Sequence, residues 1–221
     1  LLGISLGGGL QMMKEIGRYR RERTGMMTSN GAEGGGFLRR FPDSRGPSCL
    51  VTEMVGMIDS HARKLHLGHG YSCHICLLRP KSVGTLALAS ADSLAAPRID
   101  PNFLGHADDL EAMVDGFKLT RKLMDAPILA GIRTGEVYTE GIHSDDAIRE
   151  ELRNRSDTIY HPVGTCKMGS DAMAVVDTRL RVHGLEGLRV VDASIMPTLV
   201  GGNTTAPTLM IAEKAADMIR G

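Results

Sequence analysis

The chain has 221 residues, and its 26 basic and 26 acidic side chains give a formal net charge of zero at pH 7. This balance excludes a nucleic-acid or acidic partner attracted by bulk charge. Charged residues make up 24% of the chain and apolar residues 42%, an ordinary composition for about one to one and a half globular domains. No window approaches the roughly 20 apolar residues of a membrane-spanning helix. Because residue 1 is Leu1 rather than Met, we expect the sequence to begin inside a longer protein.

Four cysteines, Cys49, Cys73, Cys76 and Cys166, are irregularly spaced. This spacing is unlike that of a disulfide-stapled secreted scaffold, so it favours reduced thiols in a cytosol-like compartment. Cys73 and Cys76 form a C-x-x-C motif, but the motif lies inside a strand-like run and lacks two further soft ligands at zinc spacing. We therefore expect buried strand thiols there, and neither a metal site nor a redox site.

The first half of the chain is expected to open with a helix and to continue as strands. Residues 10–24 are basic and amphipathic, and we interpret them as a solvated helix face, because no basic excess elsewhere would extend a nucleic-acid footprint. Residues 34–36 are glycines without the G-x-G-x-x-G spacing of a dinucleotide-binding loop. Alternating or β-rich stretches predict an antiparallel sheet with one covered face at residues 48–58, 69–80, 84–90 and 98–103.

Two helices are expected after these strands. Asp108 and Glu111 form a capping pair before an apolar stripe that runs to Asp125. A shorter helix should begin near Ser144, with acidic residues in its first turn, where they complement the helix dipole.

The C-terminal region has the pattern of a strand, a loop and a helix. A β-branched run at 188–191 stops at Asp192, a Gly loop follows, and a helix is predicted at 207–220. In α/β proteins such a unit places its loop at the carboxyl edge of a sheet, where ligands bind. The expected fold class is thus α+β with an α/β element: an antiparallel sheet with flanking helices, followed by this strand, loop and helix.

Two segments of this region could carry chemistry. Pro162 fixes the backbone directly after His161, and Gly164 allows a sharp turn, so the imidazole would sit on a rigid bend. Asn203 precedes the last helix, whose orphan N–H groups favour an anion. The alternatives are a histidine that satisfies loop carbonyls and an ordinary helix cap, since Asn and Thr are common caps.

Taken together, HPVGTCKMG, AVVDTRLRVHGLEGLRVVDASIMP and GGNTTAPTLMIAEKAADMI resemble the C-terminal signature of the glucose-methanol-choline oxidoreductases. Upstream, TSNGAEGGGFLR, KLHLGHGYSCHICLLRPKSVGTLALAS and RIDPNFL extend the resemblance over nearly the whole chain. Within that family the sequence looks most like the choline dehydrogenases and related bacterial alcohol dehydrogenases.

The resemblance implies a flavoprotein that oxidises an alcohol to an aldehyde or ketone by passing a hydride to FAD. The HPVGT histidine falls on His161, the base that faces the substrate hydroxyl, and the family's second active-site position falls on Asn203. Asp192 and Ala193 match a segment that lines FAD, and Asn203 and Thr204 match the loop beside the flavin ring. A neutral imidazole suits the base role, because histidine side chains ordinarily titrate at about pH 6.5.

The dinucleotide fingerprint of that family is missing from this sequence. We therefore expect a C-terminal portion of a longer enzyme, with a substrate-binding domain at 1–157 that is partial at its N-terminus. Residues 158–221 would carry the active-site histidine and complete the FAD domain. Such a portion would need the missing N-terminal FAD-binding part and would not retain FAD alone.

The substrate stays open between a choline-like primary alcohol and an aliphatic alcohol. Glu33 is the candidate carboxylate for a cationic substrate, whereas 4% aromatic residues make an aromatic cage unexpected. The alternative to an enzyme portion is an inactive fragment or a partner module. We expect no metal, nucleic acid or transmembrane segment, and a cytoplasmic location with peripheral attachment to the inner membrane left open. The electron acceptor, whether a quinone, a soluble carrier or oxygen, is not identified.

Overall fold

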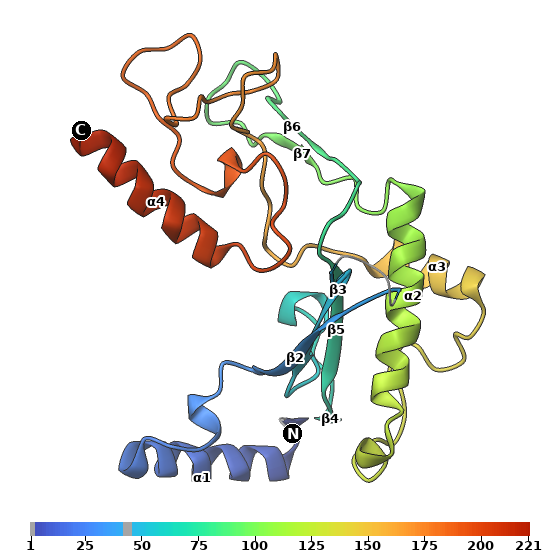
Figure 1. The fold of residues 1–221 in the computed structure, drawn as a ribbon. Coiled ribbons are helices and arrows are strands. Elements are labelled where there is room, and N and C mark those ends of the chain that lie inside the picture. Colours follow the sequence, from blue (N-terminus) through green and yellow to red (C-terminus); the bar gives the residue numbers. More distant parts are fainter. Residues whose placement is uncertain (1–2, 42–45) are drawn as a thin grey trace. The chain divides into compact units, whose positions relative to one another are not determined.

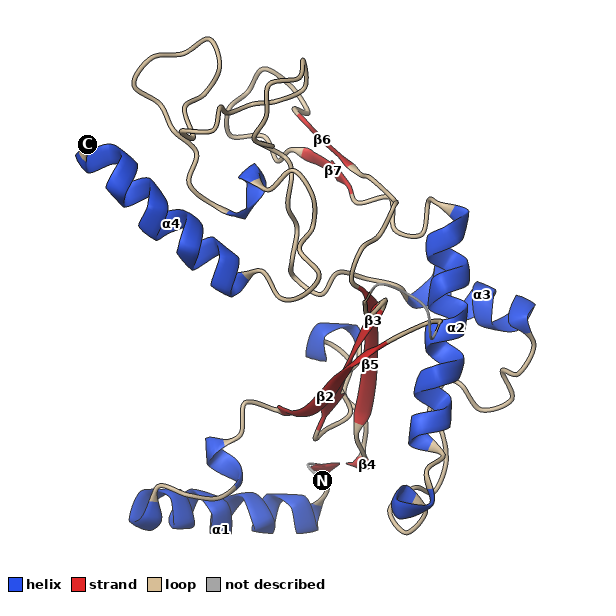
Figure 2. Cartoon of the chain, in the orientation of Figure 1, coloured by secondary structure: helices blue, strands red, loops and turns tan. Residues whose placement is uncertain are grey.

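A computed structural model describes residues 3–41 and 46–221 of the chain (Figure 1). The chain divides into two compact units. The first unit comprises Leu1–Cys76 and Asp115–Glu140, and the second comprises Leu77–Val114 and Gly141–Gly221. The described residues form four α-helices and three small sheets (Figure 2). This mixed architecture confirms the expected fold class, while the domain division at residues 157 and 158 stays a prediction.

The first unit opens with strand β1 (Gly3–Ile4) and helix α1 (Leu6–Glu22). The helix starts before the predicted residue 10 because Ser5 caps it, accepting a hydrogen bond from the Gly8 N–H at 2.9 Å. No residue of α1 is buried. The predicted solvated helix is therefore confirmed with a shifted start.

The larger sheet of this unit has the order β2-β3-β5. Its strands are β2 (Ala32–Leu38), β3 (Cys49–Met54) and β5 (Ser72–Leu77), and β2 pairs antiparallel with β3. The glycine run that we did not assign to a strand forms β2. A Cβ on Gly35 would lie 2.7 Å from the Val51 carbonyl oxygen, so glycine permits the close approach of the two backbones. A further short strand, β4 (Gly68–His69), pairs with β1.

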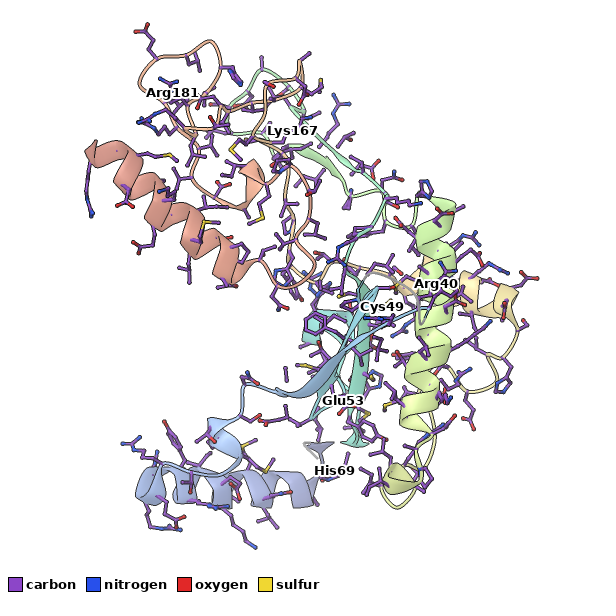
Figure 3. The ribbon with its side chains drawn as sticks, in the orientation of Figure 1. Arg40, Cys49, Glu53, His69, Lys167 and Arg181 are labelled. Atoms are coloured by element: carbon purple, nitrogen blue, oxygen red, sulfur yellow. The ribbon has the colours of Figure 1, made fainter. Side chains whose placement is uncertain are left out.

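Cys73 and Cys76 lie on a strand as predicted, but they are half-buried and not buried, and Cys166 lies in a turn. All four are free thiols; Cys49 is buried on β3, and Cys73 and Cys76 are half-buried on β5. Burial raises the pKa of Cys49 and of Cys73 to about 11. Figure 3 shows Cys49 and Arg40 beside helix α2 (Ala107–Met124), where the Arg40 Nε lies 2.5 Å from a carboxylate oxygen of Asp115.

The second unit contains a strand pair and two of the predicted helix starts. Strands β6 (Thr85–Ala87) and β7 (Arg98–Asp100) pair antiparallel, and every residue in them is exposed. The prediction of a covered face is therefore wrong for this pair, because nothing in its own unit packs over it. Helices α2 (Ala107–Met124) and α3 (Asp145–Arg155) confirm the two predicted helices.

The helix starts differ in how they are capped. Ser144 caps α3 by accepting from the Ala147 N–H at 3.2 Å, as predicted. Asp108 lies inside the first turn of α2 instead of at its cap, and its carboxylate pairs with Lys81. The predicted capping role of Asp108 is therefore wrong, because the helix already begins at Ala107 and Asp108 is its second residue.

The last part of the second unit surrounds a small core beneath helix α4 (Thr205–Arg220). This core consists of Val176, Leu180, Ile195, Met196, Ile211 and Ala215. Arg181 and Lys167 lie on the loops of this region (Figure 3). No helix in the described part of the chain is long and apolar enough to cross a membrane.

The predicted strand at 188–191 is wrong. Within residues 176–191 the described backbone forms isolated bridges, one of which joins Arg181 to Arg189. The Val190 N–H donates to the Leu180 carbonyl at 3.1 Å, and the Val182 N–H donates to the Leu188 carbonyl at 3.0 Å. A regular strand needs a partner along its whole length, and this looped segment supplies one only at scattered positions.

Candidate active site

The loop that carries His161 is shaped by its backbone. Tyr160 adopts a left-handed conformation with φ 69°, and Gly164 does so with φ 88°. The Lys167 N–H then closes a turn onto the Gly164 carbonyl at 3.2 Å. Since Pro162 also restricts the chain, the histidine sits on a constrained bend, as the sequence predicted.

This bend is fastened to the segment that follows Asp192. The Cys166 N–H donates to the Ser194 carbonyl at 3.0 Å, and the Met168 N–H donates to the Ile195 carbonyl at 2.8 Å. Asp192 in turn accepts from the Ser194 N–H at 2.7 Å and caps a short 3-10 turn at Ala193–Ile195. The two predicted cofactor residues, Asp192 and Ala193, thus belong to the structure that supports the His161 loop.

Thr204 holds the imidazole. It occupies the N-cap position of α4 with 7% of its surface exposed, yet its side chain makes no capping hydrogen bond. Instead its Oγ1 lies 2.8 Å from Nδ1 of the half-buried His161. If Nδ1–H donates to this oxygen, the opposite ring nitrogen, Nε2, keeps its lone pair and can accept a proton.

The fold thus brings three of the predicted site residues together. Asn203 is exposed and directly precedes Thr204, and Thr204 contacts His161. The Gly202 N–H donates to the Val200 carbonyl at 2.8 Å, which shapes the loop before them. Asn203 offers a donor and an acceptor at the start of α4. A proton acceptor, an amide and a helix N-terminus therefore occupy one small region.

Glu33 is not assembled with these residues. It is exposed on β2 and belongs to the first unit, whereas His161 belongs to the second. Its role with a substrate stays a prediction. A hollow of ≈410 Å³ lined by Asp177 and residues 181–189 also contains none of the predicted site residues.

Two further features were missed by the sequence analysis. The bond between Thr204 and His161 joins positions 43 apart, and no local pattern indicates it. Arg79 packs its guanidinium against Gly201, at the start of the loop that carries Asn203. The adjacent glycines at 201 and 202 were the only signal that something approaches the backbone closely there.

The chain was compared with known proteins. The family model described as GMC oxidoreductase matches residues 80–212, which is more than half of the chain. An alcohol dehydrogenase [acceptor] from Pseudomonas putida is 47% identical over 202 residues, covering 91% of this chain and 37% of its own length. An oxygen-dependent choline dehydrogenase from Cronobacter sakazakii is 43% identical over 200 residues, covering 90% of this chain and 36% of its own. The chain thus spans a little over a third of the length of these relatives.

Solved structures show the same fold. Pyridoxine 4-oxidase from Mesorbium loti matches 86% of this chain and 38% of its own with a TM-score of 0.78 and 31% identity. A variant of formate oxidase from Aspergillus oryzae RIB40, made to study FAD modification, matches 99% of this chain and 44% of its own with a TM-score of 0.84 and 24% identity. Because the family model matches more than half of the chain, from residue 80 to residue 212, the chain belongs to the GMC oxidoreductases.

Proposed function

We propose that this chain supplies the catalytic base of an FAD-dependent enzyme that oxidises an alcohol. The observation that carries the proposal is the 2.8 Å contact between Nδ1 of His161 and Oγ1 of Thr204. This contact fixes one ring nitrogen and leaves the other available for a proton. The enzyme names of the relatives, an alcohol dehydrogenase and a choline dehydrogenase, fit the same chemistry.

The reaction follows from the roles of the two side chains. Nε2 of His161 takes the hydroxyl proton of the alcohol, while the N–H of Nδ1 donates to Thr204 and holds the ring in that tautomer. The Asn203 side-chain amide donates a hydrogen bond to the same oxygen and lowers the energy of the charge that develops on it. As the proton leaves, the carbon and oxygen form a double bond and the carbon releases a hydride.

The N-terminus of α4 fits a group that becomes negatively charged. The hydroxyl of the cap residue, Thr204, contacts His161 and does not bond the helix. The first N–H groups of α4 therefore have no side-chain cap, and the positive end of the helix dipole lies there. We propose that Asp192, Ala193, Asn203 and Thr204 line the flavin here. FAD supplies the hydride acceptor when it is bound.

For the substrate we propose a choline-like primary alcohol, with an aliphatic alcohol as the second candidate. One relative is an oxygen-dependent choline dehydrogenase at 43% identity, and another is an alcohol dehydrogenase [acceptor] at 47% identity. Glu33 is proposed to face the cationic group of the first candidate. Binding of FAD would need an N-terminal part with the dinucleotide fingerprint. We propose a cytoplasmic enzyme, and the proposal does not include its electron acceptor or an attachment to the inner membrane.

The direct test is His161→Ala in the full-length protein. Loss of a general base should lower kcat/KM for the alcohol by about 10²–10⁴-fold with the flavin still bound. The matched control is His143→Ala, because His143 is an exposed loop histidine of the same unit. A loss below about tenfold for His161→Ala would remove it from the base role.

Flavin retention has its own test. The 221-residue chain, purified alone, is expected to show no absorbance near 450 nm, where oxidised flavin absorbs. Stoichiometric flavin in that preparation would contradict the need for a further FAD-binding part.

A further inference from the structure

The Arg79 guanidinium lies against the backbone of Gly201. A Cβ built on Gly201 would lie 2.8 Å from Cζ and 3.3 Å from Nη1 of Arg79, and closer still to Nη2. These distances are shorter than van der Waals contact, so the guanidinium occupies the space that any side chain at position 201 would need. Both residues belong to the second unit.

A side chain at position 201 would therefore require the guanidinium to move, whereas the backbone angles of Gly201 place no such limit. Its φ lies outside the left-handed range, as does that of Gly202. A Cβ on Gly202 would meet nothing within 4 Å. The two adjacent glycines thus differ in the guanidinium that lies against the first of them.

The backbone on either side of Arg79 is firmly held. Leu78, just before it, is 2% exposed. After it, the N–H groups of Lys81 and Ser82 donate to the buried carboxylate of Asp109 at 2.9 Å and 2.7 Å. Since Pro80 lies between these fixed points, the Arg79 side chain extends from a rigid base.

We propose that Arg79 is a positioning residue that braces the loop at 200–204. By filling the space beside Gly201, it limits the movement of the loop that carries Asn203 and Thr204. Thr204 in turn holds His161. The expected effect on turnover rests on the proposed function. The inference adds Arg79, from a separate segment of the chain, to the residues that hold the catalytic base in place.

The test uses four variants of the full-length protein: Gly201→Ala, Gly202→Ala, Arg79→Ala and the double variant of Gly201 and Arg79. Hydrogen exchange is measured on the peptide that covers residues 198–206. Gly201→Ala and Arg79→Ala should each speed exchange there by about tenfold or more, and Gly202→Ala should leave it within about twofold. The double variant should exchange no faster than Arg79→Ala alone, because the clash is gone.

Turnover is measured on the same proteins. Arg79→Ala should lower kcat about tenfold while KM and the melting temperature stay near those of the parent, because a displaced base slows the chemical step. A fifth variant, Arg79→Lys, retains the charge without the planar guanidinium. It should show the same low kcat and the same fast loop exchange as Arg79→Ala.

The inference would be overturned by equal exchange in the two glycine variants, or by unchanged loop exchange in Arg79→Ala. Full restoration by lysine would also overturn it, since charge alone would then suffice. If His161→Ala keeps full turnover, the proposed function fails, and the exchange data still decide whether Arg79 braces the loop.

Discussion

Thr204→Val removes the hydroxyl that holds His161 and keeps the size of the side chain. Thr204 is 7% exposed, so valine should pack in the same space, and the cost comes from the 2.8 Å hydrogen bond to Nδ1. One such bond contributes about 0.5–1.5 kcal/mol to stability. Because His161 is half-buried, water can replace part of it, and we expect a loss of about 1 kcal/mol in the free energy of unfolding.

The effect on turnover should be larger than this loss of stability suggests. Without its partner the imidazole can rotate and exchange tautomers, and a misplaced catalytic group costs up to about 10²-fold. We expect kcat/KM to fall about 10–100-fold in Thr204→Val and to stay within about threefold in Thr204→Ser, which keeps the hydroxyl. Steady-state kinetics and urea denaturation of the full-length protein measure both quantities.

Thr208→Val is the matched control. Thr208 donates its hydroxyl to the Thr204 carbonyl at 2.7 Å, so this variant also loses one hydrogen bond of α4 while the His161 contact remains. It should lose a similar amount of stability and keep its turnover. Equal turnover losses in the Thr204→Val and Thr208→Val variants would refute the assignment of Thr204 as the residue that orients the base.

Three more predictions concern the frame around the site. Asp109→Ala removes a 4% exposed carboxylate that accepts hydrogen bonds from the backbone N–H groups of Lys81 and Ser82. Urea denaturation should show that the free energy of unfolding falls by about 2–4 kcal/mol. A fall below about 1 kcal/mol would contradict the anchoring role of Asp109. Burial raises the pKa of Cys49 and Cys73 to about 11, so iodoacetamide at about pH 8 should alkylate them more than about tenfold slower in the folded chain than after denaturation. Hydrogen bonds from Arg181 lower the pKa of Asp177 from 3.8 to about 2, so its stabilising contribution is present above pH 3.8 and lost as the pH falls through about 2. NMR of the segment 177–190 should show this acid transition in the parent and not in Asp177→Asn.

Elements with local signals were predicted well. Ser144 and the acidic residues after it mark the start of α3 by capping and dipole effects within a single turn. The strands β3 and β5 are recognisable because their own residues favour extended structure. Strand β2 is different, since its glycines have low strand propensity and it forms through pairing with β3. The strand prediction at 188–191 was wrong for the opposite reason: its residues favour extended structure, but too few backbone groups pair with them.

The same distinction applies to the site. His161 and Asn203 were selected from the proline, the glycine and the helix start beside them, and the family resemblance supplied their expected roles. The contacts around them were not predicted. The contact of His161 with Thr204 and that of Arg79 with Gly201 both depend on how distant segments fold together. A capping rule even points the wrong way at Thr204, since a threonine before a helix is expected to bond the helix and here bonds the histidine.

The strained backbone of Tyr160 should lower stability while it supports turnover. Its left-handed backbone with φ 69° costs a non-glycine residue about 1–2 kcal/mol, and 66% of its surface is exposed, so packing repays little of that. Glycine at this position would relieve the strain, but it would also loosen the chain one residue before His161. Directed evolution for heat resistance alone should therefore change Tyr160 early and lose activity, whereas selection for both properties should keep it.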